Sequence, residues 1–312
     1  MSRWAPWIVA SVLAVLPLIG LSTYMMHILI LVIMWSVIGM AWNLLGGYCG
    51  QVSFGHAAFF GIGAYTAGIL YFKGGLSAWW GLPLSIFFVA LASLIIGYVT
   101  LRLRGPFFAL GTLAIGEVCR VTAENLRDFT QGTLGIMLQQ RTWVEKTWYY
   151  YIILGIAIIT FVVIKRIINS KMGYYFVAIR EDQDAAESLG INTTLYKTIA
   201  LVLSGVFTGL AGAFYTNYMG YIDPEVVFAL HDISIITIMV VMVGGVATFW
   251  GPVVGAVIMV LLAELIRSIP KLGAAHQTMF GILLILIIIF LPNGIVGDFR
   301  KILRVFRIGG RS

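Results

Sequence analysis

Residues 24–45 read YMMHILILVIMWSVIGMAWNLL, and this stretch decides the fold class. It lies within a longer segment, from Trp4 to Phe72, that contains no Asp, Glu, Lys or Arg. A helix needs about 20 apolar residues to cross the roughly 30 Å hydrocarbon core of a bilayer. Further segments without these charged residues lie at 74–101, 147–164, 198–222, 233–263 and 272–297. The pattern predicts an all-α polytopic membrane protein and excludes a soluble enzyme and a β-barrel, whose strands alternate over about ten residues.

We predict about ten spans in a single transmembrane domain that covers residues 1–312. Only 11% of the residues are charged, against roughly a quarter in a typical soluble domain. The predicted spans are 5–22, 24–45, 53–72, 79–101, 106–123, 147–168, 196–218, 232–250, 252–268 and 275–292. We interpret the first as a retained helix rather than a signal peptide, because its basic region is a single Arg and another span follows at once.

Basic residues gather after the even-numbered spans, which sets the expected orientation. They are Arg102 and Arg104, then Lys165, Arg166, Lys171 and Arg180, and finally Arg300, Lys301, Arg304, Arg307 and Arg311. Short cytoplasmic loops of membrane proteins carry an excess of Lys and Arg, so both termini are predicted to be cytoplasmic. The net charge of +7 therefore indicates membrane topology rather than nucleic-acid binding.

Two segments are rich in glycine for spanning helices. Residues 46–68 hold seven glycines, and residues 244–255 hold four glycines and a proline. This composition fits close helix packing, and it equally fits broken or re-entrant helices that line a translocation path. Both segments pair a Gly-Gly with a later aromatic-Gly. The number of residues from this aromatic-Gly to the next similar Glu-x-x-Arg string differs between the two, so there is no fixed period and we infer no internal repeat.

The loop at 170–197 is the longest predicted cytoplasmic segment between spans. Its middle, residues 181–189, has a helical composition, and Gly190 is a natural end for that helix. Ala185, Ala186 and Leu189 share one face by their spacing. A helix this short is not stable alone, so it is either a solvated linker or a contact for a partner.

At these residues the chain resembles a known family. Asp184-Ala185-Ala186, followed after three residues by Gly190, resembles the Glu-Ala-Ala-x-x-x-Gly loop of ABC importer permeases, with Asp in place of Glu and without the usual Ile-x-Leu-Pro ending. The strings GQVSFGHAAFFGIGAY (50–65), RGPFFAL (104–110), AIRED (178–182) and GLAGA (209–213) are similar to the branched-chain amino acid branch of these permeases. The resemblance covers about residues 40–295.

The resemblance implies a bacterial inner-membrane permease subunit that imports branched-chain or related hydrophobic amino acids. Its implied partners are a second homologous permease, two ATPase subunits, a periplasmic binding protein and membrane lipid. The implied ATPase-coupling residues are Arg180, Glu181, Asp182, Asp184, Ala185, Ala186, Glu187 and Gly190. The sequence contains no Gly-x-x-x-x-Gly-Lys-Ser/Thr, so we expect no cofactor on this chain and place ATP and Mg²⁺ on the separate ATPase chains.

Polar residues within the spans give candidates for the translocation pathway: Gln51, Ser53, His56, Glu117 and Arg120. For each, a structural role in packing, pairing or hydrogen bonding is the competing interpretation. Asn43 and Asn217 are expected to form hydrogen bonds between helices. We find no nucleophile–base arrangement and no set of metal ligands, and we therefore predict no catalytic or metal site.

Three other functions remain open. A permease of a urea or short-chain amide importer would share the Gly-His-rich string. An ion-coupled secondary carrier would need intramembrane carboxylates, for which Glu117 and Glu264 are the candidates, each three residues before an Arg. An intramembrane enzyme is the least supported, because no active-site set is visible.

Overall fold

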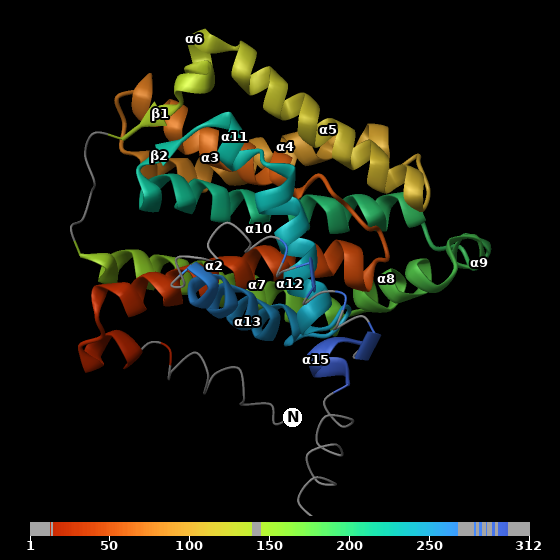
Figure 1. Ribbon diagram of the computed structural model, residues 1–312. Helices are drawn as coiled ribbons and strands as arrows, with labels where there is room; N and C mark the ends of the chain where they lie inside the picture. The colour runs from red at the N-terminus through yellow and green to blue at the C-terminus, as the bar shows by residue number, and fades with distance from the viewer. Residues whose placement is uncertain are drawn as a thin grey trace, which may run out of the picture.

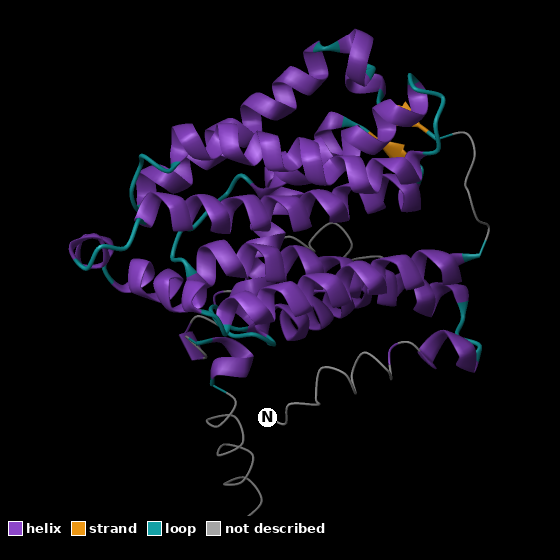
Figure 2. Cartoon of the chain, turned by 180° about the vertical axis from the view of Figure 1, so that it is seen from behind, coloured by secondary structure: helices purple, strands orange, loops and turns teal. Residues whose placement is uncertain are grey.

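The computed structural model describes residues 15–138, 145–267 and 293–298, together with Leu13 and scattered residues between 278 and 290. Helices dominate these ranges, and the two short strands pair with each other (Figure 2). Figure 1 shows long helices stacked side by side, with α5 on one face of the bundle and α2, α7 and α13 on the opposite face. The prediction of an all-α transmembrane bundle is confirmed.

The elements run in the following order. The first half contains η1 (Leu16–Ile19), α2 (Thr23–Trp42), the π-helical turn η2 (Asn43–Tyr48), α3 (His56–Phe72), η3 (Ala78–Trp80), α4 (Gly81–Thr100), α5 (Pro106–Asn125), α6 (Arg127–Thr130), η4 (Gly132–Leu134) and β1 (Ile136–Met137). The second half contains α7 (Lys146–Ile168), α8 (Lys171–Glu181), α9 (Gln183–Ser188), α10 (Thr193–Met219), β2 (Tyr221–Ile222), α11 (Pro224–Val227), the π-helical turn η5 (Leu230–Ile235), α12 (Ile236–Gly244), α13 (Gly251–Arg267) and α15 (Gly294–Gly297).

Six of these helical segments are long and apolar enough to cross a membrane within the described residues. They are Thr23–Tyr48, Ala78–Thr100, Pro106–Asn125, Lys146–Ile168, Thr193–Met219 and Pro224–Gly244. The predicted count of about ten is not confirmed. The predicted spans 53–72 and 252–268 form α3 and α13, each 17 residues long, and such a helix covers about 25 Å at roughly 1.5 Å per residue. Most of the predicted span 275–292 and half of the predicted span 5–22 lie outside the described residues.

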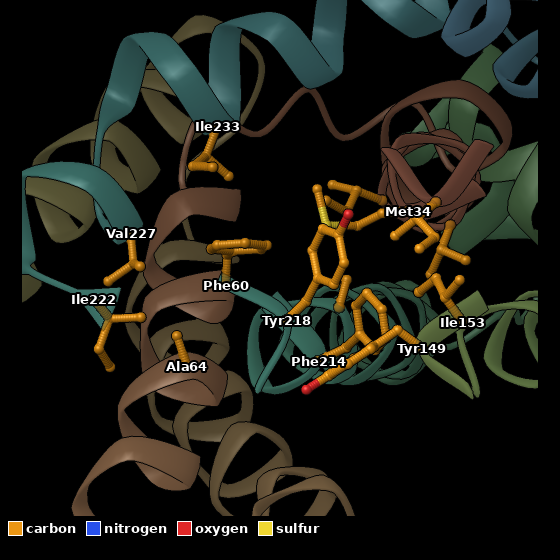
Figure 3. Packing of buried hydrophobic residues seen from close by; sticks show 14 of the residues in the cluster. Met34, Phe60, Ala64, Tyr149, Ile153, Phe214, Tyr218, Ile222, Val227 and Ile233 are labelled. Atoms are coloured by element: carbon orange, nitrogen blue, oxygen red, sulfur yellow. The ribbon is translucent and has the colours of Figure 1, made fainter. Parts of the chain in front are cut away.

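The core lies where α2, α3, α7 and α10 meet. Figure 3 shows Phe60 from α3 and Phe214 and Tyr218 from α10 among the buried side chains, with Met34 and Ile153 on the far side of the cluster. Lipid tails are as apolar as these side chains, so dense van der Waals packing, rather than exclusion of water, fixes the helix positions here. This cluster holds the two faces of the bundle together.

Glycine brings α3 and α10 into backbone contact. A Cβ added at Gly63 would lie 2.0 Å from the Gly209 carbonyl oxygen, and one added at Gly212 would lie 2.0 Å from the Phe60 carbonyl oxygen. Helices in membranes approach closely where small residues face each other. For this part of the first Gly-rich segment, the packing interpretation is therefore the one that the structure supports.

The two ends of the bundle differ. One end carries β1, β2 and α6, while α8 and α9 project from the other (Figure 1). The turn between α12 and α13 and the segment before α15 meet at the second end, because a Cβ at Gly294 would lie 2.4 Å from the Gly245 Cα. Residues 293–298 therefore lie at the same end of the molecule as the α8–α9 segment.

Candidate functional site

The α8–α9 segment, residues 170–192, is two helices rather than the single helix predicted at 181–189. Asp182 has an extended backbone (φ −157°, ψ 111°) that separates α8 from α9. Its carboxylate accepts hydrogen bonds from the backbone N–H groups of Asp184 and Ala185, at 2.9 and 3.0 Å. Such a cap satisfies the free N–H groups at a helix start and adds a favourable charge there. Asp182 therefore sets the bend in the segment.

Gly190 ends the second helix, as predicted. Its φ of +84° is the left-handed conformation that side chains disfavour, and no atom lies within 4 Å of a Cβ built on it. The N–H of Ile191 donates to the Ala186 carbonyl at 3.1 Å, which closes the turn. The cost of a larger residue here is thus one of backbone conformation and not of space.

The prediction that Ala185, Ala186 and Leu189 share one face of the helix is wrong, because Ala186 faces the other way. Ala186 is 2% exposed and packs into the chain's own core, whereas Leu189 is 81% exposed and Ala185 is also exposed. The reason is that the helix ends at Ser188 and the chain turns back, so Leu189 leaves the helical register. The outward apolar side chains of α9 are therefore those of Ala185 and Leu189.

Lys197 anchors the segment to the membrane bundle. It is 2% exposed, and its ammonium group donates to the Leu101 carbonyl at 3.3 Å and to Gln183 Oε1 at 3.2 Å. A buried cation is costly unless it is hydrogen-bonded, so these contacts tie the end of α4 to the start of α9. Sequence analysis missed Lys197, because its spacing from Leu101 and Gln183 carries no signal.

Glu187 holds the return of the chain into α10. Its Oε1 accepts hydrogen bonds from Thr193 Oγ1 at 2.5 Å and from Gln183 Nε2 at 2.9 Å. These two bonds, with that of Thr193 the larger cause, hold the pKa of Glu187 below its usual value. A lowered carboxyl pKa stabilises the folded segment above the ordinary pKa of 4.5, and this contribution is lost as the pH falls through the lowered value.

Asp184, the acid of the family-like string, pairs with a residue outside the loop. Arg104 Nη1 lies 2.7 Å from Asp184 Oδ1, and both side chains are largely exposed. Exposed ion pairs contribute only about 0–1 kcal/mol, so the pair orients α9 more than it stabilises it. Arg104 belongs to the turn between α4 and α5, which thereby contacts the segment.

Arg180 points inward, to the first Gly-rich segment. Its Nη1 donates to the Gly47 carbonyl at 3.3 Å, and its Nη2 and Nε donate to Glu181. A Cβ at Gly50 would lie 2.7 Å from Arg180 Cγ, so glycine is needed there for the arginine to pass. The last turn of α8 is thus in contact with the chain that follows η2.

Asn43, the first residue of the η2 turn, joins that turn to the second Gly-rich segment, residues 244–255. Its Nδ2 donates to the Thr248 carbonyl, and its Oδ1 accepts from the Ala247 N–H, both at 2.9 Å. The expected hydrogen bonding of Asn43 is confirmed, as is that of Asn217, which donates to the Ala78 carbonyl at 3.2 Å. The two Gly-rich segments, about 200 residues apart in sequence, therefore meet beside Arg180.

Three of the pathway candidates lie in or beside the packed interior. His56 is fully buried; its Nε2 hydrogen-bonds to Ser204 Oγ at 2.7 Å and its Nδ1 has no partner. Ser53 is also buried, and its Oγ accepts from the Gly55 N–H at 3.2 Å. Gln51 is half-buried. These contacts describe packing and capping roles.

The other two candidates lie together on α5. Arg120 pairs with Glu117 and also with Glu124, which lies one helical turn further along and is not among the candidates predicted from the sequence. Half of the Glu117 side chain is exposed. Charges on a membrane-spanning helix face water or protein rather than lipid, so this face of α5 requires a polar neighbour.

Comparison with known proteins identifies the family. The family model described as "Branched-chain amino acid transport system / permease component" matches residues 24–291. The high-affinity branched-chain amino acid transport system permease protein LivM of Salmonella typhimurium is 29% identical over 289 residues, covering 83% of this chain and 67% of that protein. The corresponding permease protein LivH of Escherichia coli is 29% identical over 128 residues, covering 41% of this chain and 40% of that protein.

One solved structure also aligns, PsaBC from Streptococcus pneumoniae in complex with Fab. The TM-score is 0.48 at 15% identity, covering 87% of this chain and 93% of that one. With the family model matching most of the chain, the chain belongs to the permease components of branched-chain amino acid ABC transport systems, as a multi-pass membrane protein and not an enzyme.

Proposed function

We propose that this chain is the permease subunit of an ATP-driven importer of branched-chain or related hydrophobic amino acids. In this proposal it pairs with a second, homologous permease and two ATPase subunits and receives substrate from a periplasmic binding protein. ATP and Mg²⁺ bind the ATPase subunits only. The proposal places the chain in a bacterial inner membrane, with the α8–α9 segment and both termini in the cytoplasm.

The observation that carries the proposal is the construction of the α8–α9 segment. It projects from one end of the bundle (Figure 1) and presents Leu189, Ala185 and Tyr174 outward. Large apolar side chains that stay exposed outside the spanning helices, as Leu189 and Tyr174 do, are typical of a protein contact. We assign this face to the ATPase subunit, with Asp184, Glu181 and Arg180 at its edge.

The same segment supplies a route for motion into the membrane domain. A displacement of α8 moves Arg180, which contacts Gly47 and passes Gly50. The adjoining η2 turn holds the 245–250 turn through Asn43. Motions of α8 therefore bear on both Gly-rich segments at once. In this scheme Asp182 and Gly190 fix the ends of α9, and Glu187 holds it against α10.

The charged face of α5 supports the position of the second permease. Glu117 and Arg120 require protein or water in front of them, and a homologous permease with the pathway between the two chains supplies both. We accordingly retain Glu117 and Arg120 as pathway residues. His56, Ser53 and Gln51 act in this scheme by supporting the start of α3, which begins beside the η2 turn.

Co-purification and cross-linking test the proposal. The complex, purified through this chain, should contain stoichiometric ATPase chains, and a Leu189→Cys variant should cross-link to one of them. Leu189→Asp should abolish transport while membrane insertion stays normal. Ala186→Cys is the matched control, because its side chain faces the core and should give no cross-link.

A complex without ATPase chains, whose uptake follows an ion gradient, would instead support a secondary carrier. A cross-link from Ala186→Cys but not from Leu189→Cys would reverse the assignment of the two faces of α9.

A further inference from the structure

A groove runs along the face of the bundle opposite α5. It has a volume of about 450 Å³ and is lined by α2, α7, the 249–250 turn and the start of α13, together with Leu13. Its apolar side chains include Ile33, Leu154, Ile158, Val162 and Val253. A volume of this size falls within the roughly 300–1,000 Å³ of small-molecule sites. The groove is therefore large enough for an apolar ligand.

The groove is long and runs along the axis of α7. Its lining extends from Leu154 on α7 to Asn169, which caps the end of that helix, and this is about 22 Å at roughly 1.5 Å per residue. Half of the roughly 30 Å hydrocarbon core belongs to each leaflet. The groove thus matches an acyl chain of one leaflet together with the beginning of its head group.

Positive charge is concentrated at one mouth of the groove. Lys165 and Arg166 line it there, beside the polar side chain of Asn169. Neither basic residue forms an ion pair with any residue in the described ranges, in contrast to Arg104, Arg120 and Arg180. Two neighbouring cations without a carboxylate favour an anionic ligand.

An aromatic cluster marks the same mouth as a membrane interface. Phe161, Phe249 and Trp250 pack edge to face or tilted, with ring centroids 5.5–6.1 Å apart. The Lys165 ammonium lies 5.9 Å from the centre of the Phe249 ring. Trp residues and basic side chains together are typical of the level of lipid head groups.

We propose that this groove binds an anionic phospholipid of the leaflet on the α8–α9 side. Lys165 and Arg166 hold the head-group phosphate, whose negative charge no cationic head group neutralises, and one acyl chain lies along α7 against α2 and α13. The occupant is lipid rather than the second permease, because the face that needs polar protein is that of α5, on the far side of the bundle (Figure 1). The inference depends on the chain lying in a bilayer, and not on transport.

A lipid bound in the groove would contact the 245–250 turn, which is hydrogen-bonded to Asn43. Phe249 and Trp250 belong to the 245–250 turn and also line the groove. Occupancy would therefore stabilise the turn against α7, while Arg180 acts on the η2 turn from the other direction.

The experiment uses the intact purified complex, stripped of lipid and titrated with phosphatidylglycerol or phosphatidylcholine that carry the same acyl chains. Native mass spectrometry counts the lipids retained. We expect a preference of about tenfold for phosphatidylglycerol, given two basic residues at the head-group level. The double variant K165Q/R166Q should lose this preference, while K165R/R166K should keep it. R102Q, which removes an exposed basic residue outside the groove, is the matched control.

A groove-filling variant separates a bound lipid from surface attraction. Val253→Trp leaves both cations in place and should abolish retention of either lipid, with assembly checked by size-exclusion chromatography. Equal retention of the two lipids by the unaltered complex, or an unchanged preference in K165Q/R166Q, would overturn the proposal. A cross-link from Ile158→Cys to the second permease would also overturn it and would identify the groove as a subunit interface.

Discussion

The helices α4 and α5 follow each other in the chain, and in the most apolar stretch of each only 22% of the residues are buried. Their exposed faces nevertheless differ in kind. On α4 the outward side chains are apolar, including Phe87, Leu91 and Ile95, while Ser85 and Ser93 face inward. On α5 the outward face is mixed: Leu110 and Val118 are apolar and exposed, but Glu117 is half-exposed and pairs with Arg120.

This difference indicates what each helix faces. A helix with apolar residues outside and small polar residues inside is suited to contact with lipid. A helix with ionised groups on its open face needs protein or water there. Equal burial within one chain can therefore hide two environments, and the chemistry of the exposed face separates them.

The largest effect should come from placing a charge on the lipid-facing helix. Leu91→Arg lies near the middle of α4, where an arginine costs roughly 2.5–3.5 kcal/mol of insertion free energy. Val118→Arg on α5 should cost clearly less, because a polar neighbour can accept the charge. Membrane-inserted protein, measured by fluorescence-detected size exclusion of a fusion, should fall strongly for Leu91→Arg only. Equal losses would remove the distinction between the two faces.

A smaller effect on stability should show how tightly α4 and α5 each pack against the rest of the bundle. A Cβ at Gly209 would lie 2.5 Å from Val89 Cγ2 of α4, and β-branched valine cannot easily turn away. Gly209→Ala should destabilise the protein by about 1–3 kcal/mol. Gly116 of α5 has only the Gly55 Cα near such a Cβ, at 3.9 Å.

Gly116→Ala should accordingly be neutral or stabilising by up to about 1 kcal/mol, because alanine is the better helix former. Thermal unfolding of the solubilised protein compares the two variants. Destabilisation by Gly116→Ala as large as that by Gly209→Ala would show that α5 is packed as firmly as α4.

The smallest effect on stability should come from neutralising the α5 charge, although its effect on transport should be plain. Glu117→Gln leaves Arg120 paired with Glu124, so the free energy of unfolding should change by about 0.2–1 kcal/mol. Uptake should fall, because the proposed pathway face has changed its charge. Tyr98→Phe on the exposed face of α4 is the control and should leave uptake as it was; a fall of the same size in the control would contradict a special role for α5.

The sequence predicted the bundle well and the site in part. Charge-free segments placed seven of the described helices, because a membrane span has a length set by the bilayer. The helix α5 was placed from its apolar residues, although it contains Glu117 and Arg120. Gly190 was predicted correctly, since a helix end with positive φ is a local property. The orientation of Ala186 and Leu189 was not, because the helix ends one residue before Leu189 and three-dimensional packing decides which side faces the core.

Contacts between segments that are far apart in the sequence could not be predicted either, because they too depend on three-dimensional packing. The meeting of Arg180, Gly47 and Asn43 with the 245–250 turn depends on how three separate stretches pack, and no spacing rule connects them. The pair Glu117 and Arg120 was visible from its spacing on one helix, whereas its placement on an exposed face required the structure.

Uptake of radiolabelled leucine into proteoliposomes tests the central claim most directly. The vesicles would contain the purified complex with ATP inside and the loaded binding protein outside, and Leu189→Asp would serve as the uncoupled variant. The account predicts uptake that requires ATP and the binding protein and that Leu189→Asp abolishes. Leucine uptake without ATP, driven by an imposed ion gradient and unchanged in Leu189→Asp, would contradict it.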